Sequence, residues 1–404
     1  MKQNTREYLI MLISGTLTMF SVGFVWPIFP TYVRTEFDAS LQLIGIAVSG
    51  YFLLRMITEF PVGAISDRTG PKTPLIIGRI LAIFGAFVGF RTKSVGLLIF
   101  ARMVWGIGDA SFFCIGLAYV SKLFTSEKRG RALGSFQAIE MIGNLAGQAL
   151  GGYFADKYGL RMNFLASTIM TVAALAMVMF IKGSPGGSYA GLAKIQLKSL
   201  IPTWTNLRQI MNRTVVAICL INVVCMVIWN GLIGTIVPLF ATENIGLSLS
   251  QYALMVSIST VGSISGNLIG GVLSDKFGRK RVLIAGFVIG VLAIFGFIAF
   301  RSFFPLILAM FLMGTFWGTV YGVAPAYIAD TVAPQFRGIG IGTYRTFFDF
   351  GGLVGPVVVS TIAEMFGGSS GYIYSFYFCA ILVAGLVALA IPLKEVTAER
   401  KDES

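Results

Sequence analysis

Long apolar runs separated by short polar turns cover nearly the whole chain. Each run has about 18 to 25 residues, enough for a helix to cross ~30 Å of hydrocarbon. Backbone groups in lipid must pair within their own segment, and the runs lack the alternation of barrel strands, so they indicate helices. The pattern predicts an all-α membrane protein with twelve transmembrane helices, over residues 8–33, 40–65, 73–91, 95–122, 130–153, 161–182, 213–240, 250–273, 282–300, 303–329, 339–363 and 371–393.

The first apolar run is predicted to be a permanent helix. It is too long for the apolar core of a signal peptide, and Phe24, Trp26 and Pro27 stand where a cleavage site needs small residues.

Composition and charge agree with this reading. Of the 404 residues, 56% are hydrophobic and 12% are charged, whereas a soluble protein carries about a quarter charged residues. The net charge of +13 is that of many nucleic-acid-binding proteins, but the basic residues gather on alternate turns. With the N-terminus inside, about 21 of the 31 Lys and Arg lie on the cytoplasmic side and about 6 on the other. We therefore expect the lipid bilayer of the cytoplasmic membrane as the partner, no nucleic acid, and both termini in the cytoplasm.

Residue types that carry enzymatic chemistry are scarce. The four cysteines lie inside predicted helices without metal-ligand spacing, so neither disulfides nor a metal site is expected. The chain has no histidine, so proton transfer must use carboxylates. A Ser–His pair and a phosphate-binding loop are missing too, and we expect a monomeric protein that is not an enzyme and needs no cofactor.

The second half of the chain repeats the first. A shift of 208 residues aligns turns and helix glycines without a gap over more than a hundred residues. The aligned pairs are Pro30 with Pro238, Gly63 with Gly271, Asp67 with Asp275, Gly70 with Gly278, Lys72 with Lys280, Gly106 with Gly314, Tyr119 with Tyr327, Arg129–Gly130 with Arg337–Gly338, and Gly147 with Gly355. Two six-helix halves of one orientation imply a repeat about an axis along the membrane normal.

The repeat sets the predicted domain boundaries. Residues 1–182 form the N-terminal bundle and 213–393 the C-terminal bundle. The polar segment 183–212, which begins GSPGGSYAG, is a cytoplasmic linker, and 394–404 is a solvated cytoplasmic tail.

With two such halves and these turns, the chain resembles the major facilitator superfamily over nearly its full length. The loop signature of that family, G-x-x-x-D-R/K-x-G-R/K-R/K, matches twice. The first copy has Gly63, Asp67, Arg68, Gly70 and Lys72, with Pro71 in place of a base, and the second has Gly271, Asp275, Lys276, Gly278, Arg279 and Lys280. RMVWGIGDA (102–110) resembles the pattern of helix 4, and GNLAGQALGG (143–152) resembles the antiporter motif with Gln148 in place of its proline. The resemblance favours the twelve-helix branch of drug–proton antiporters.

Both copies of the loop signature are expected to act in gating. Gly63 and Gly271 allow close backbone approach at the cytoplasmic ends of helices 2 and 8. Asp67 and Asp275 can then satisfy the N-terminal N–H groups of helix 11 and helix 5 in the opposite half. Breaking these contacts would open the cytoplasmic side, which is also the role that the resemblance implies.

Ionisable residues deep in a membrane are costly, so each is a functional candidate. Asp109 and Glu140 have no basic residue one helical turn away and are the first candidates for proton coupling, followed by Asp349 and Glu59. The last two can also form structural pairs, Arg345–Asp349 and Arg55–Glu59, at i, i+4 spacing. Arg102 can also pair with a carboxylate of another helix.

Helices 1, 4, 7 and 10 are expected to meet around the substrate, with polar stripes of helices 2, 5, 8 and 11 beside them. The candidates for the substrate cavity are Trp26, Phe29, Arg55, Arg102, Trp105, Gln137, Asn144, Asn222, Trp229, Asn230, Ser263, Phe316, Trp317, Tyr321 and Arg345. The aromatic residues suit amphipathic or cationic compounds, whereas the arginines suit an organic anion. The predicted function is proton-coupled export of small organic or drug-like molecules by alternating access; the alternative is a symporter or facilitator for a small metabolite or organic anion.

Overall fold

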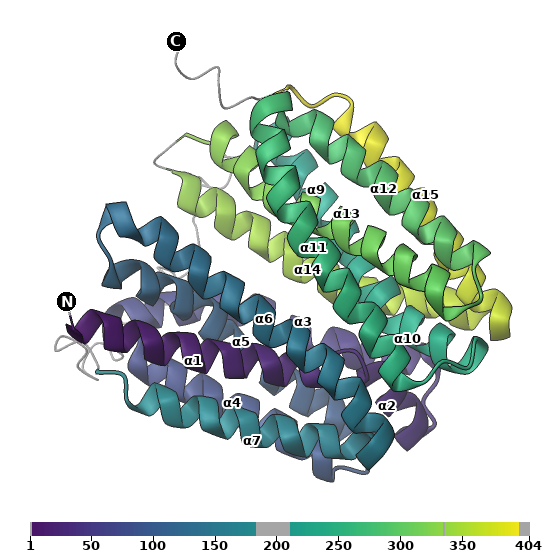
Figure 1. The fold of residues 1–404 in the computed structure, drawn as a ribbon, viewed down its shortest axis with the longest axis horizontal. Coiled ribbons are helices and arrows are strands. Elements are labelled where there is room, and N and C mark those ends of the chain that lie inside the picture. The colour runs from purple at the N-terminus through teal and green to yellow at the C-terminus, as the bar shows by residue number, and fades with distance from the viewer. Residues whose placement is uncertain (1, 183–210, 334–335, 396–404) are drawn as a thin grey trace. The chain divides into compact units, whose positions relative to one another are not determined.

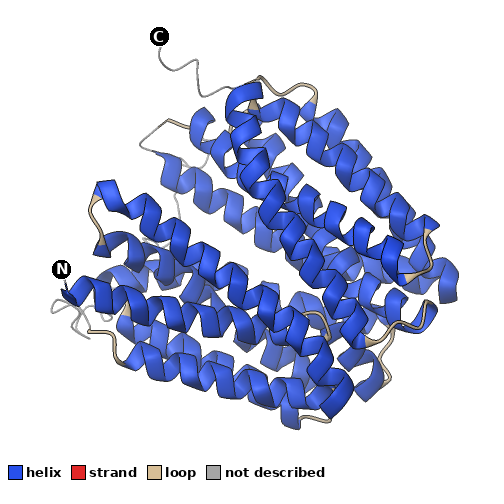
Figure 2. Cartoon of the chain, in the orientation of Figure 1, coloured by secondary structure: helices blue, strands red, loops and turns tan. Residues whose placement is uncertain are grey.

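In a computed structural model, residues 2–182, 211–333 and 336–395 are described, and they form helices joined by short turns with no β-strand among them (Figure 2). The predicted all-α class is confirmed. Eleven helices within these ranges are long and apolar enough to cross a membrane. α6, at the position of predicted helix 5, is as long but carries a polar stripe that lowers its hydropathy.

The first half of the chain contains seven helices in its described part. They are α1 (Lys2–Val25), α2 (Phe29–Phe37), α3 (Leu41–Thr69), α4 (Lys72–Arg91), α5 (Val95–Leu123), α6 (Ser126–Tyr158) and α7 (Leu160–Met179) (Figure 1).

The second half has the same succession of long helices, with a different first member. Its elements are α9 (Arg213–Met226), the π-helix η3 (Val227–Ile236), α10 (Val237–Leu239), the π-helix η4 (Phe240–Asn244), α11 (Leu249–Phe277), α12 (Arg279–Ala299), α13 (Phe303–Thr331), α14 (Arg337–Phe366) and α15 (Gly368–Ala390) (Figure 1).

Two predicted helices differ from the observed ones. Predicted helix 1 is divided into α1 and α2 by a turn at 26–28, because Pro27 has no N–H to donate and restricts the residue before it. Predicted helix 7 is continuous, but much of it is a π-helix. The apolar pattern of the sequence does not distinguish a π-helix from an α-helix, so this difference could not be predicted.

The described residues divide into two compact units, and α3 belongs to both. Among the described residues, the first unit holds 2–38 and 50–182, and the second holds 39–49, 211–333 and 336–395. The division therefore cuts α3 after Ser49. The predicted linker (183–212) and tail (394–404) lie almost entirely outside the described residues, so the predicted boundaries stay predictions.

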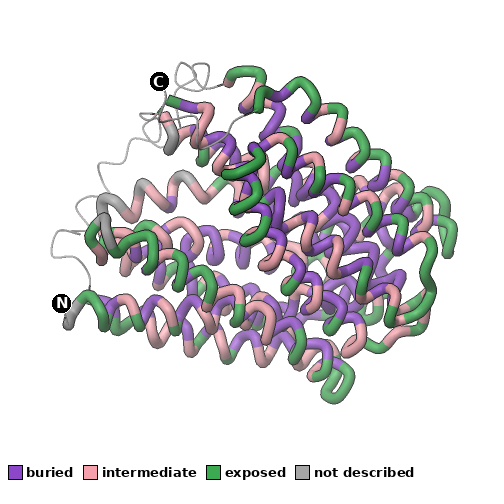
Figure 3. Tube along the Cα trace, turned by 45° about the horizontal axis from the view of Figure 1, so that its top comes forward, coloured by how far each residue is buried: buried purple, intermediate pink, exposed green. Residues whose placement is uncertain are grey.

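Glycines join the same helix pair in both units. In α6, a Cβ on Gly143 would lie 2.7 Å from the carbonyl oxygen of Thr16, and one on Gly151 would lie 2.6 Å from that of Phe24. In the second unit, a Cβ on Gly351 of α14 would lie 2.6 Å from the carbonyl oxygen of Val223 in α9. The antiporter-like motif and its repeat thus bring two helix backbones into contact. Figure 3 shows buried positions recurring along the helices of the chain.

Gly147, at the centre of the seam between α1 and α6, supplies a test of this packing. A Cβ there would meet the backbone of Phe20, whereas one on Gly134 of the same helix would meet nothing within 4 Å. We expect Gly147→Ala to cost about 1–3 kcal/mol through overpacking, and Gly134→Ala to cost nothing. Unfolding midpoints of the two variants in detergent check this, and equal midpoints would contradict the packing role.

Candidate functional site

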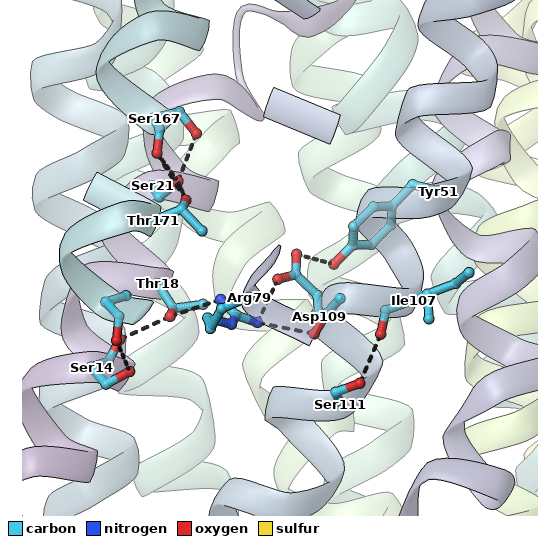
Figure 4. Close-up of polar contacts among 12 residues, drawn as sticks. Ser14, Thr18, Ser21, Tyr51, Arg79, Ile107, Asp109, Ser111, Ser167 and Thr171 are labelled. Carbon is cyan, nitrogen blue, oxygen red and sulfur yellow. Dashed lines mark hydrogen bonds and ion pairs between the residues drawn. The ribbon is translucent and has the colours of Figure 1, made fainter. Parts of the chain in front are cut away.

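A buried ion pair lies at the centre of the first unit. Arg79 of α4 approaches Asp109 of α5 with Nη2 3.1 Å from Oδ1, and both side chains are about 1% exposed. The other carboxylate oxygen, Oδ2, accepts a hydrogen bond of 2.9 Å from the Tyr51 hydroxyl of α3. Arg79 also donates to the Thr18 hydroxyl at 2.9 Å and to the Gly108 carbonyl at 3.0 Å. Figure 4 shows Arg79 between Thr18 and Asp109, with Tyr51 on the far side of the carboxylate.

Small residues place this pair. A Cβ on Gly78 of α4 would lie 2.9 Å from the Gly108 carbonyl oxygen, so the two helices touch backbone to backbone beside Arg79 and Asp109. Gly106 likewise lies against the Tyr51 backbone. The pattern that resembles the family's helix 4 motif therefore supplies the close approach that lets three helices share one carboxylate.

Arg102 lies near this pair, in a box of aromatic rings. Its guanidinium carbon is 4.3 Å from the ring centre of Phe29, 5.0 Å from that of Tyr51 and 5.3 Å from that of Trp105. The side chain is buried, and its Nε has no hydrogen-bond partner among the described residues. Since Asp109 makes its ion pair with Arg79, the faces of these rings provide much of the compensation for the Arg102 charge.

The predicted pair Arg55–Glu59 is present in α3. Arg55 Nη2 lies 3.7 Å from Glu59 Oε1, and the guanidinium also lies 5.0 Å from the ring centre of Phe113. Glu59 is therefore a member of a structural pair in this conformation.

Glu140 is placed differently from Asp109. It is half-buried in α6 and faces α1, where a Cβ added to Gly15 would lie 2.8 Å from its Oε1. That oxygen is inaccessible to water and has no hydrogen-bond partner, and Glu140 forms no ion pair within the described residues. Glu140, one of the four predicted proton carriers, can therefore bind or release a proton at a partly buried carboxyl without breaking an ion pair with a basic side chain.

In the second unit, four aromatic side chains form a cluster, which we call the Trp317 cluster. Trp229 of η3 stacks on Trp317 of α13 with ring centres 5.0 Å apart and planes 18° apart. Tyr321 and Phe348 each lie 5.9 Å from the Trp317 ring. Tyr321 is 40% exposed, and the other three are half-buried. The cluster therefore leaves ring surface available on the unit.

Other cavity candidates of the second unit serve helix packing. Phe316 is 1% exposed and packs against Phe287 of α12. Asn222 of α9 donates to the Tyr344 carbonyl of α14 at 3.0 Å. Asn230 is buried in η3, and the Ser263 backbone lies against α13. Asp349 is buried at 1% exposure and Arg345 is half-buried; their pairing stays a prediction.

The remaining candidates of the first unit have mixed positions. Phe29 and Trp105 are buried around Arg102, and Trp26 is half-buried. Asn144 accepts a 2.7 Å hydrogen bond from Gln148 and donates to the Met19 carbonyl, so it helps to hold α6 on α1. Gln137 is exposed.

The two glycine turns share one backbone form. Gly70 and Gly278 adopt φ of 82° and 98°, which favour glycine. In the second turn Asp275 pairs with Arg279 at 2.6 Å, and Arg279 also lies 3.4 Å from Asp330 of α13. The Lys280 backbone donates to Glu395, and Lys276 is exposed at the end of α11.

The other residues of the two loop signatures show no burial that would mark a contact. Half-buried positions are Gly63, Gly271 and Lys72, and the side chains of Asp67 and Arg68 lie outside the described residues. The expected contacts with the opposite half stay predictions.

Sequence reasoning missed Arg79, Tyr51 and Phe348. The signal for Arg79 was present, because it is a lone arginine in the middle of an apolar run, the same feature that marked Arg55. Asp109 has no base one turn away on its own helix; its base, Arg79, comes from α4 instead. Tyr51 and Phe348 carried no comparable signal.

Comparison with known proteins decides the family. The model of the Major Facilitator Superfamily matches residues 11–233 and again 218–404. The chain belongs to the major facilitator superfamily. As a member, it is a multi-pass membrane transporter and not an enzyme.

Relatives within the major facilitator superfamily differ in what they carry. Multidrug resistance protein 2 of Bacillus subtilis is 23% identical over 399 residues, covering 96% of both chains. The proton-coupled antiporter flippase LtaA of Staphylococcus haemolyticus is 24% identical over 388 residues, covering 94% of this chain and 92% of its own. The crystal structure of the nucleoside transporter NupG matches with a TM-score of 0.78 at 13% identity, covering 96% of this chain and 100% of its own, and shows the shared fold.

Proposed function

We propose that this transporter exports small organic or drug-like molecules across the cytoplasmic membrane in exchange for protons, by alternating access between its two halves. The observation that carries the proposal is Glu140, a half-buried residue with a buried carboxylate oxygen, Oε1, and no ion pair in the described residues. Two relatives, a multidrug resistance protein and a proton-coupled antiporter, support the same activity by their names.

Glu140 is better suited to carry the proton than Asp109. To take up a proton, Asp109 would have to give up its 3.1 Å contact with Arg79, leaving a buried guanidinium without its counter-ion. Glu140 has no such contact to lose. In exchange transport, a cationic substrate and a proton can compete for one carboxylate, so that binding of either releases the other.

The Trp317 cluster is the proposed contact for a flat aromatic part of the substrate. Its rings come from three elements, and Tyr321 extends the stacked pair Trp229–Trp317 along one face of α13. Face-on contact with a cationic ring system adds cation–π attraction to apolar burial.

Trp317→Ala tests this contact. We expect it to weaken the binding of ethidium, a planar aromatic cation with a fixed charge, about tenfold. Phe304→Ala is the matched control, because Phe304 lies on the same helix but is 80% exposed. Fluorescence titration of the detergent-purified variants measures both affinities. Equal affinities in Trp317→Ala and wild type would remove the cluster from the substrate site.

A second candidate function, transport of an organic anion, is favoured by Arg102. Within the described part of the chain, its buried guanidinium has an Nε without a hydrogen-bond partner and forms no ion pair with a carboxylate. An anionic substrate group could supply that charge. Counterflow of carboxyfluorescein in the absence of an ion gradient, lost in Arg102→Gln, would favour this candidate over proton-coupled export.

A further inference from the structure

A buried tyrosine hydroxyl of the second unit lacks a hydrogen-bond partner. Tyr344 of α14 is 4% exposed, and its hydroxyl oxygen is inaccessible to water and unbonded within the described residues. Every other buried tyrosine in the described ranges donates a hydrogen bond to an oxygen; these are Tyr32, Tyr51, Tyr252, Tyr327 and Tyr372. Because an unpaired buried hydroxyl costs free energy, the hydroxyl of Tyr344 needs an explanation.

Tyr344 lies beside the Trp317 cluster. Phe348, a member of the cluster, is four residues further along α14, so both side chains share one face of that helix. Tyr321 of α13, another member, is close enough to the Tyr344 hydroxyl for an electrostatic interaction. The three helices α9, α13 and α14 contact one another within the second unit (Figure 1). The unpaired hydroxyl therefore stands next to the ring surface of the cluster.

The residues of α9 hold the backbone of Tyr344 but leave its hydroxyl unbonded. The Asn222 side chain donates to the Tyr344 carbonyl at 3.0 Å, which fixes the main chain of α14 at this point. The thiols of Cys219 and Cys225 lie near the hydroxyl but form no hydrogen bond with it. Sulfur is a weak acceptor in any case. The protein thus fixes the position of this tyrosine without using its O–H group.

We infer that the Tyr344 hydroxyl donates a hydrogen bond to the substrate and selects planar aromatic compounds that carry an acceptor, such as a ring carbonyl. Ligand sites combine apolar walls with a few polar groups that fix orientation, and here the Trp317 cluster supplies the wall. A ligand oxygen that accepts from Tyr344 removes the cost of the unpaired hydroxyl, whereas an apolar ring edge does not.

The hydroxyl can reach a ligand at low cost. In this conformation water does not reach it, so the side chain must turn toward the rings of the cluster. Since the hydroxyl bonds to nothing in the described residues, this turn breaks no hydrogen bond. The inference rests on the proposed role of the Trp317 cluster in substrate binding and is independent of the proton carrier.

The test uses two ligands that differ only in their ring carbonyls: an anthraquinone and an anthracene with the same trimethylammonium side chain. Isothermal titration calorimetry measures the binding of each to the detergent-purified full-length protein. We expect Tyr344→Phe to weaken binding of the anthraquinone about fivefold, the worth of one hydrogen bond, and to leave binding of the anthracene unchanged. The variant keeps the ring, and its unfolding midpoint without ligand should not fall, because no hydrogen bond is lost.

Two control variants complete the design. Tyr377→Phe removes a hydroxyl from a 44% exposed residue of α15 and should change neither affinity. Trp317→Ala should weaken both ligands, because both need the ring surface. The inference is overturned if Tyr344→Phe leaves the anthraquinone affinity unchanged, weakens both ligands equally, or lowers the unfolding midpoint. Failure of both ligands to bind wild type would instead remove the whole Trp317 cluster from the substrate site, and this inference with it.

Discussion

Arg79→Met is expected to destabilise the protein by about 3–5 kcal/mol, because it leaves the Asp109 carboxylate buried without its cation. Both partners are about 1% exposed, and water cannot replace the guanidinium. The hydrogen bond from Tyr51 remains but does not neutralise the charge. The effect is measured as the shift of the unfolding midpoint in detergent, which is determined from the loss of monodisperse protein on heating.

Two comparisons separate this effect from a general loss of an arginine. Arg161→Met breaks an ion pair of 2.6 Å with Glu36, whose side chains are 30% exposed, so we expect a loss below about 1 kcal/mol. The double variant Arg79→Met, Asp109→Leu removes both buried charges and should recover much of the stability lost in the single variant. If Arg79→Met is as stable as wild type, the pair is not the structural centre of the first unit.

Glu140→Gln is expected to abolish proton-driven accumulation of substrate while leaving substrate binding in place. Glutamine keeps the size of the side chain but cannot take up or release a proton. Accumulation of ethidium in proteoliposomes under a pH gradient should fall to the level of vesicles without protein. Asp156→Asn removes a carboxylate from the exposed end of the same helix and should transport as wild type does. Full coupling in Glu140→Gln would exclude this residue as the proton carrier.

The sequence was sufficient to predict the helices because lipid allows so few alternatives. A run of about 20 apolar residues between charged turns has one stable form in a bilayer. The repeat was also visible, since glycines such as Gly147 and Gly355 mark helix contacts that both halves need. The π-helix η3 was not predictable, because it depends on packing rather than on residue period.

The ion-pair partner of a buried charge can be predicted from the sequence only when both residues lie on the same helix. Arg55 and Glu59 are four residues apart, so their pairing follows from helix geometry. Arg79 and Asp109 meet because Gly78 and Gly108 bring α4 and α5 together, a contact that one sequence does not specify. For the same reason the sequence does not predict the partner of Glu364 in α14. Its carboxylate accepts a hydrogen bond from the backbone N–H of Leu41, more than 300 residues away.

The direction of the pH gradient that drives transport tests the central claim most directly. Proteoliposomes are loaded with an acidic or a basic lumen, the membrane potential is clamped, and the initial rate of ethidium entry is measured. Exchange against protons predicts fast entry when the lumen is acidic and slow entry when it is basic, with the difference lost in Glu140→Gln. Faster entry with a basic lumen, or equal entry under both gradients, would contradict proton-coupled export.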